Sequence, residues 1–309
     1  MVIFNKALKW TQTYRGLPFF LFIHTYEIHA PYSPPGRFAT MFDSDYDGPV
    51  GTSVEMCYPK AEGFSDADKI HVEALYDGAI AYTDEVVGKF LNGLRQIGLL
   101  DKTVVIILSD HGEEFYEHGD VEHWKTLYDE VLRVPLIIKL AGRNPPVGRV
   151  RRQVSLTDVY ATIAEILGIE HAPPPDCMSL CPLMGPPESP KRYDREVIVS
   201  DLNEVDEERA ADDPTKVWSR MRSVRTDDEK YITSEKKQME ELYDLRADPG
   251  EQNNIAHENT PRLLQHRARL ASFFDSVVAG RTPPSPDERK TPLLTEDDKR
   301  RMKALGYNR

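Results

Sequence analysis

Apolar residues recur every three or four positions between Ser65 and Gly98, which predicts one long amphipathic helix. Glycine commonly stops a helix, so we expect this one to end at Gly98. Its apolar face should pack against a sheet. The residues of that face are Leu75, Ala79, Tyr82, Val86, Phe90, Leu94 and Ile97.

Three short, mainly apolar runs predict strands, at residues 19–23, 103–108 and 136–140. The run at 103–108 is rich in β-branched residues, which is typical of a parallel strand buried on both faces. Strand 19–23, the long helix and strand 103–108 together predict a βαβ unit with a right-handed crossover. A helix over 157–167, stopped by Gly168, continues an α/β pattern.

The pattern changes in the segment 171–192, which contains seven prolines and predicts a linker between domains. Beyond it, 197–199, 218–225 and 230–234 read as short strands of a smaller antiparallel sheet, separated by an acidic loop. We expect a helix over 263–278 to pack on that sheet and a last helix over 295–305. Two of the three cysteines, Cys177 and Cys181, lie in the linker; they could form a disulfide, bind a metal or stay reduced, and the lack of a second pair argues against zinc.

The composition indicates a globular chain, and its charge excludes one class of partner. With 40% hydrophobic and 29% charged residues, 309 residues can bury a large core and a smaller second core. The formal net charge of -12 argues against nucleic acid, whose binding relies on many Lys and Arg contacts to phosphate. The sequence has no run of roughly 18 apolar residues that could cross a bilayer, and no visible signal peptide.

Metal-ligand and acid/base side chains follow strand 103–108 at once, beginning with Asp110 and His111. Ligands of open α/β sheets bind beyond the carboxyl ends of the strands, so this pair is positioned to hold one divalent cation. The carboxylate favours calcium or magnesium, while the imidazole favours manganese or zinc. In the plainer interpretation, Asp110 caps a helix and His111 is an ordinary loop residue.

The block 108–138 resembles the sulfatase family of the alkaline phosphatase superfamily, in the branch that writes Asp-His-Gly-Glu at 110–113. Residues 18–32 resemble the family's strand and loop ending in Asp-Pro-His-x-Pro-Tyr, although Glu27 and Ile28 replace the Asp and Pro. Residues 221–256 resemble its C-terminal subdomain, and 302–307 resemble an ending of this branch.

This resemblance implies an alkaline-phosphatase-like mixed sheet sandwiched by helices, plus a smaller C-terminal α+β subdomain with an antiparallel sheet. Residues 1–170 would form part of the catalytic α/β domain, 171–192 the Pro-rich linker and 193–309 the C-terminal subdomain. The implied activity is metal-dependent hydrolysis of a small-molecule or glycan sulfate ester, with calcium as the expected ion and manganese, magnesium or zinc as alternatives. The family also implies a periplasmic or secreted protein.

The resemblance assigns roles to individual residues. Asp110 and His111 would supply half of a four-ligand cation site, and His29 would contact the sulfate or the leaving group. His123 or Lys125 would contact the anion. His29 could instead be a half-buried loop residue held by hydrogen bonds, and His118 and Glu114 could either support the site or simply order the loop.

The family's nucleophile motif, Cys/Ser-x-Pro/Ala-x-Arg, and the other two metal-binding Asp residues normally precede the strand at 19–23. Ser33–Arg37 fits the letters but lies in the wrong loop, and Cys57–Ala61 lacks the Arg. We therefore expect this chain alone to lack the nucleophile and half of the metal site. The alternatives are a phosphonate or phosphodiester hydrolase or phosphoethanolamine-type transferase of the same superfamily, and an inactive fragment or non-catalytic relative.

Overall fold

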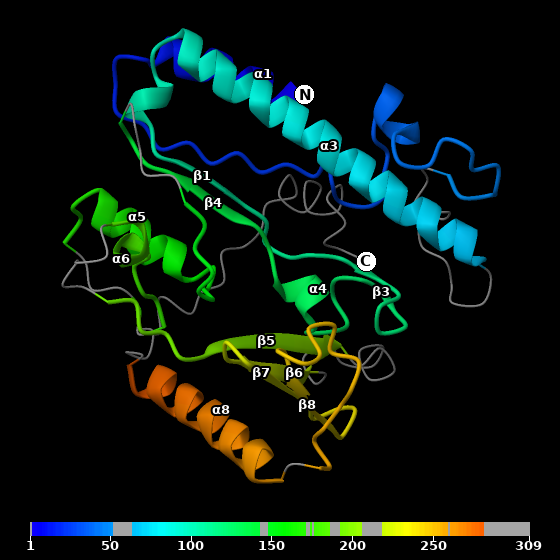
Figure 1. Ribbon diagram of the computed structural model, residues 1–309. Helices are drawn as coiled ribbons and strands as arrows, with labels where there is room; N and C mark the ends of the chain where they lie inside the picture. The colour runs from blue at the N-terminus through cyan, green and yellow to red at the C-terminus, as the bar shows by residue number, and fades with distance from the viewer. Residues whose placement is uncertain are drawn as a thin grey trace.

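The structure is a computed structural model that describes residues 2–51, 64–142, 148–170, 174, 176–185, 192–205, 218–258 and 260–280. Figure 1 shows a part built from helices and two paired strands above a second part, in which a helix covers a sheet. None of the helices in the described ranges combines the length and apolar composition needed to cross a bilayer.

The predicted long helix is confirmed as α3 (Asp66–Gln96). It begins with a capping box, in which the side chains of Ser65 and Asp68 each accept a hydrogen bond from the other's backbone N–H. Helix α1 (Val2–Thr13) packs along it, and the rings of Phe4 and Phe90 meet edge to face at 5.8 Å. The short 3-10 helices η1 (Gly36–Thr40) and η2 (Leu100–Lys102) also contact α3.

The predicted strands at 103–108 and 136–140 are present, but the expected parallel direction of the first is wrong. β1 (Val105–Leu108) pairs antiparallel with β4 (Leu136–Lys139). An apolar run carries no information about strand direction, and the chain returns to β4 without the long crossover helix of a parallel pair. Burial of the first strand on both faces is also wrong, because none of its four residues is fully buried and Leu108 is 40% exposed, in a sheet that has two strands within the described residues.

Residues 19–23, predicted as a strand, are extended but join no sheet of the described chain. Their side chains nevertheless alternate as in a strand. Phe20 and Phe22 are each 74% exposed, whereas Phe19 packs with Val105 in a core at the end of α3. The predicted βαβ unit is therefore not formed, since its first strand has no ladder partner among the residues described.

The connection from β1 to β4 contains a small hairpin, β2 (Glu114–Phe115) and β3 (Val121–Glu122), and then α4 (Asp129–Leu132). The backbone that follows β1 is hydrogen-bonded directly to the backbone of α4. Gly112 donates its N–H to the carbonyl of Val131 at 2.7 Å, and Glu113 donates to the carbonyl of Glu130 at 3.0 Å. A Cβ atom on Gly112 would lie 1.9 Å from that Glu130 oxygen, so only glycine fits.

Helix α5 (Asp158–Ile166) confirms the helix predicted over 157–167, and α6 (Cys181–Met184) follows it. The carboxylate of Asp158 is fully buried; it accepts the hydroxyl of Tyr193 at 2.7 Å and forms an ion pair with Arg195. These bonds join α5 to the chain beyond the Pro-rich segment. Cys177 and Cys181 are free thiols, so the disulfide alternative is not realised.

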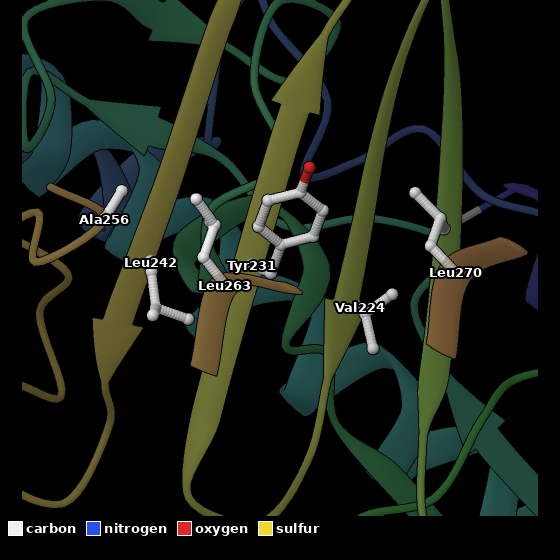
Figure 2. Close-up of a cluster of buried hydrophobic side chains, with 6 residues drawn as sticks. All are labelled: Val224, Tyr231, Leu242, Ala256, Leu263 and Leu270. Carbon is white, nitrogen blue, oxygen red and sulfur yellow. The ribbon is translucent and has the colours of Figure 1, made fainter. Parts of the chain in front are cut away.

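The C-terminal part is a four-stranded antiparallel sheet in the order β5-β6-β7-β8. Its strands are β5 (Ile198–Val205), β6 (Trp218–Arg225), β7 (Glu229–Ser234) and β8 (Met239–Asp244). The predicted helix over 263–278 is confirmed as α8 (Thr260–Gly280), which covers one face of the sheet. Figure 2 shows the core between them, built from Val224, Tyr231, Leu242, Ala256, Leu263 and Leu270. The helix predicted over 295–305 lies outside the described residues.

The other face of this sheet packs against the segment that precedes α4. Leu127 is buried there with residues of β6, β7 and β8 and with Leu245, which follows β8. The C-terminal sheet and the β1–β4 connection therefore share one core. The residues of that core are Leu127, Met221, Ile232, Tyr243 and Leu245.

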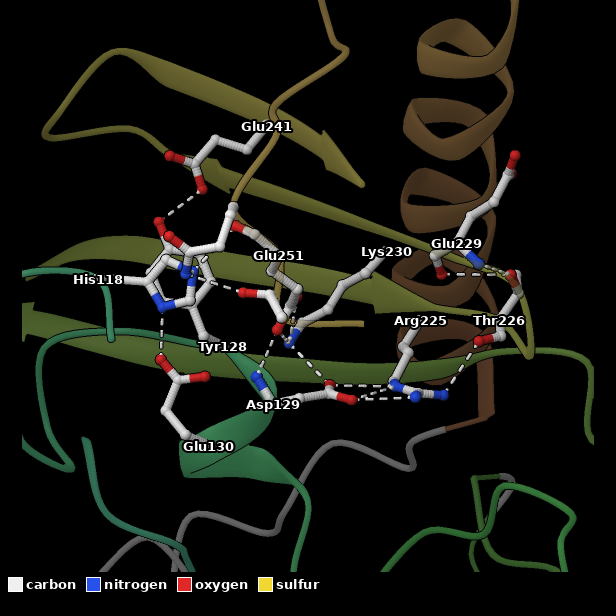
Figure 3. Close-up of polar contacts among 12 residues, drawn as sticks. His118, Tyr128, Asp129, Glu130, Arg225, Thr226, Glu229, Lys230, Glu241 and Glu251 are labelled. Carbon is white, nitrogen blue, oxygen red and sulfur yellow. Dashed lines mark hydrogen bonds and ion pairs between the residues drawn. The ribbon is translucent and has the colours of Figure 1, made fainter. Parts of the chain in front are cut away.

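His118, in the turn between β2 and β3, joins three segments. Its Nδ1 lies 2.5 Å from Oε1 of Glu130 and its Nε2 lies 2.9 Å from the carbonyl oxygen of Glu251 (Figure 3). Both oxygens are acceptors, so the imidazole donates from both nitrogens and is positively charged. Burial lowers the pKa of His118, but the hydrogen bonds to Glu251 and Glu130 outweigh burial and raise it above its usual value.

We expect Gly112→Ala to lower the free energy of unfolding by about 1–3 kcal/mol, because the new methyl group must displace the Glu130 carbonyl. Gly88→Ala is the matched control: Gly88 lies in α3 with open space around its Cβ position, so this change should be neutral or stabilising by about 0.4–1 kcal/mol. Urea unfolding measures both. Equal effects of the two substitutions would show that the close approach at Gly112 is unimportant.

The raised pKa of His118 predicts a pH-dependent contribution to stability. The unfolded pKa is about 6.5, so the contribution is complete below about pH 6.5 and is lost as the pH rises through the higher folded pKa. His118→Phe keeps a ring to stack on Tyr128 and should cost about 1.5–3 kcal/mol at low pH and less at high pH. The exposed His257→Phe should cost nothing at any pH. A cost for His118→Phe that grows with pH in urea unfolding would contradict the assignment.

Candidate active site

Three histidine rings from separate loops meet beside the end of β1. His111 and His123 stack face to face with ring centroids 3.7 Å apart, and the centroid of His29 lies 5.2 Å from that of His123 and 6.3 Å from that of His111. His29 comes from the loop after the extended segment 19–23, His111 follows β1 and His123 follows β3. The structure thus brings together three residues that the sequence marked as candidates, while their chemical roles stay predictions.

Asp110 and His111 offer two ligand atoms to a cation. Nδ1 of His111 lies 2.8 Å from the carbonyl oxygen of Gly112, so it carries the proton and donates. The lone pair is then on Nε2, which lies 3.7 Å from Oδ1 of Asp110. The Asp110 side chain is 65% exposed and the His111 side chain is 32% exposed. A carboxylate oxygen and an imidazole lone pair at this separation fit a divalent cation.

His29 has a similar backbone hydrogen bond. Its Nδ1 lies 2.7 Å from the carbonyl oxygen of Ala30 and therefore donates to it. This bond fixes the tautomer and leaves Nε2 available to exchange a proton with a bound molecule. The ring is half-buried, as the plainer interpretation also predicted.

Glu113, a residue that the sequence analysis did not single out, orients His123. Its carboxylate is nearly fully buried, with Oε1 3.1 Å from Nδ1 of His123. A carboxylate at Nδ1 holds the imidazole in one tautomer and presents Nε2 outward. The signal was present in the sequence, because Glu113 is the last letter of the Asp-His-Gly-Glu motif.

Lys125 contacts Asp120 and Trp124 rather than the three histidines. Its ammonium forms an ion pair with Asp120 and lies 5.2 Å from the ring centroid of Trp124. Asp120 already compensates part of its charge. Of the two candidates for contacting an anion, His123 is therefore the one that lies against His29 and His111.

A second group of ligand-type side chains lies nearby, formed by Glu114, His118 and Glu130, with ligand atoms within 4.8 Å of one another. Both nitrogens of His118 already donate hydrogen bonds. The buried carboxylate of Glu114 accepts hydrogen bonds from the amides of His118 and Asp120 and from the hydroxyl of Thr126. These bonds occupy both ring nitrogens of His118, and they order the hairpin.

The structure gives no support for either of the two sequences that resembled the nucleophile motif. In Ser33–Arg37, the arginine turns to α3 and forms an ion pair with Glu85 at 2.5 Å. Cys57–Ala61 lies outside the described residues.

Comparison with known proteins places these observations in a family. The family model described as Sulfatase matches residues 1–169, and the model described as N-sulphoglucosamine sulphohydrolase, C-terminal, matches residues 117–272. Arylsulfatase K of Bos taurus is 32% identical over 198 residues, which are 62% of this chain and 35% of that protein. The chain thus spans about a third of the length of this curated relative.

Solved structures show the same fold. A phosphonate monoester hydrolase of Agrobacterium radiobacter superposes with a TM-score of 0.68 at 22% identity, covering 95% of this chain and 62% of the hydrolase. A protein solved in complex with its substrate D-glucosamine-2-N,6-O-disulfate superposes with a TM-score of 0.63 at 19% identity, covering 94% of this chain and 71% of its own. The described helices and sheets are therefore those of an alkaline-phosphatase-like fold, and with a family match over more than half of its length the chain belongs to the sulfatase family of the alkaline phosphatase superfamily.

Proposed function

We propose that this chain carries one half of the active site of a sulfuric ester hydrolase that acts on a small-molecule or glycan sulfate ester. The observation that supports this most is the cluster of His29, His111 and His123 beside the accessible carboxylate of Asp110. Hydrolysis of a sulfate ester needs positive charge at the non-bridging oxygens and an acid at the leaving oxygen. The cluster offers groups for both tasks.

Sulfatases are metal-dependent, and Asp110 with Nε2 of His111 would hold part of a divalent cation. A bound cation would polarise the oxygens of the sulfate group and neutralise their charge. Calcium is the first candidate because the carboxylate is a hard ligand, and the imidazole keeps manganese, magnesium and zinc as alternatives. The protein's overall charge of -12 repels anions, so local positive charge has to attract them.

The histidines would handle protons and the anion. His29, with Nδ1 donating to the Ala30 carbonyl, would enter the reaction as the imidazolium and pass the proton on Nε2 to the leaving alcohol oxygen. His123, with Nδ1 donating to Glu113, would donate a hydrogen bond from Nε2 to a sulfate oxygen when the ring carries a second proton as the imidazolium. Lys125 would add positive charge from the rim, reduced by its pairing with Asp120.

We propose that the nucleophile, a formylglycine made from Cys or Ser, and the remaining metal ligands are supplied by polypeptide other than these 309 residues. The matched region is only 35% of the bovine arylsulfatase K, which leaves ample sequence for them in a longer protein. The exposed side chains of Phe20, Phe22 and Ile137 beside the two-stranded sheet are compatible with further strands packing there.

A phosphonate monoester hydrolase is the second candidate, because one solved enzyme of this kind covers 95% of the chain with a TM-score of 0.68. Phosphonate and sulfate esters share the tetrahedral oxyanion group, so the Asp110–His111 pair suits both. The curated relative arylsulfatase K is more similar in sequence, and for this reason the sulfate ester is preferred.

In the protein expressed from its complete reading frame and supplied with calcium or manganese, we expect turnover of a sugar sulfate ester to exceed that of a phosphonate monoester. His29→Ala should lower kcat by about 10²–10⁴-fold, the usual contribution of a general acid, and His123→Ala should also impair turnover. His257→Ala, at an exposed position of the C-terminal part, is the control and should leave kcat unchanged. Preference for the phosphonate, or wild-type turnover by His29→Ala, would refute this assignment.

A further inference from the structure

Lys230 on β7 is a charged residue in a fully buried position. Its side chain is 0% exposed, and a buried ammonium is costly unless oppositely charged groups surround it. Its Nζ lies 3.0 Å from Oδ1 of Asp129, 2.9 Å from Oε1 of Glu251 and 3.2 Å from Oε2 of Glu251 (Figure 3). Lys230 therefore connects the sheet with the first residue of α4.

Asp129 receives a second cation from the same sheet. Arg225 on β6 donates from Nε to Oδ1 at 3.1 Å and from Nη2 to Oδ2 at 3.0 Å, a two-point contact that fixes orientation as well as distance. Burial raises the pKa of Asp129, but Arg225 and Lys230 outweigh it and hold the pKa below its usual value. The carboxylate thus stays charged inside the interface.

Glu251 holds the backbone of α4. Its buried carboxylate accepts the N–H of Asp129 at 2.6 Å, in addition to its contact with Lys230. Its backbone has a φ of 53°, in the left-handed region that costs energy for a residue other than glycine. Burial raises the pKa of Glu251, and the contact with Lys230 opposes this effect. With both carboxylates ionised, the two carboxylates and two cations balance in charge.

The backbone of α4 leads directly to the candidate active site. Its carbonyl oxygens at Glu130 and Val131 accept the N–H groups of Glu113 and Gly112. Glu113 holds His123, and Gly112 follows His111. A displacement of α4 would therefore move the residues that orient the two stacked imidazoles.

We propose that Lys230 and Glu251 of the C-terminal part are positioning residues for the active site, acting through Asp129 and the carbonyl groups of α4. This inference rests on the proposed function in calling the cluster an active site and in expecting manganese to bind there. Apolar side chains of similar volume could stabilise the contact between the C-terminal sheet and α4 equally well, but they would not fix the orientation of α4. The C-terminal sheet accordingly contributes to the geometry of a site whose side chains all lie before residue 130.

The test compares Lys230→Met, which keeps the apolar stem, with Arg267→Met, which removes an exposed ion pair with Glu240 in the same part. In the complete protein, well below the unfolding temperature, amide hydrogen exchange at Gly112 and Glu113 should be at least about tenfold faster in Lys230→Met and unchanged in Arg267→Met. The affinity for manganese should fall in parallel. Wild-type exchange at both amides together with a lowered melting temperature would show that Lys230 is merely structural.

The double variant Lys230→Met/Glu251→Gln serves if the single variant does not fold, because it leaves no unpaired charge. It should be more stable than Lys230→Met and still exchange faster than the wild type at Gly112 and Glu113. Wild-type exchange in the folded double variant would overturn the inference.

Activity separates this inference from the proposed function. If exchange and manganese affinity change as expected but the wild type hydrolyses no sulfate ester, the proposed function fails and the positioning role stands. If the wild type is active and Lys230→Met keeps its kcat and its exchange rates, the positioning role fails and the proposed function stands.

Discussion

The close approach of Gly112 to the carbonyl oxygen of Glu130 is the constraint on which the candidate active site depends. It allows the backbone after β1 to lie directly on α4, with two hydrogen bonds across the contact. Asp110 and His111 precede this contact, and Glu113, which holds His123, follows it. A side chain at position 112 would push this backbone away from the Glu130 carbonyl and displace the residues on either side of it.

Much of the local structure could be predicted from the sequence. The apolar face of α3 follows from the spacing of its apolar residues. The start of this helix follows from the hydroxyl side chain of Ser65. The resemblance of 18–32 and 108–138 to one family predicted that His29 and His123 would lie near His111, as the structure places them. The antiparallel direction of β1 and β4 could not be predicted, because an uninterrupted apolar run fits a strand in either direction.

The polar residues that order the site were harder to find. Glu113 stands in the Asp-His-Gly-Glu motif, but the sequence does not show which residue it contacts; the structure shows its carboxylate buried against His123. Lys230 stands in a strand where a lysine is usually exposed, and its two carboxylate partners are about 20 and 100 residues away in the sequence. Such long-range charge balance leaves no local signal, which explains why the link between the C-terminal sheet and α4 emerged only from the structure.

The chain belongs to the sulfatase family and has its fold, and the chemistry of its candidate active site is a proposal based on the arrangement of Asp110 and the three histidines. We propose that Asp110 and His111, rather than the group formed by Glu114, His118 and Glu130, bind the divalent cation. Anomalous diffraction from a crystal of the complete protein grown with manganese tests this directly. We predict a manganese peak bonded to the Asp110 carboxylate and to Nε2 of His111; a peak bonded to Glu114, His118 and Glu130, with none at Asp110, would contradict the account.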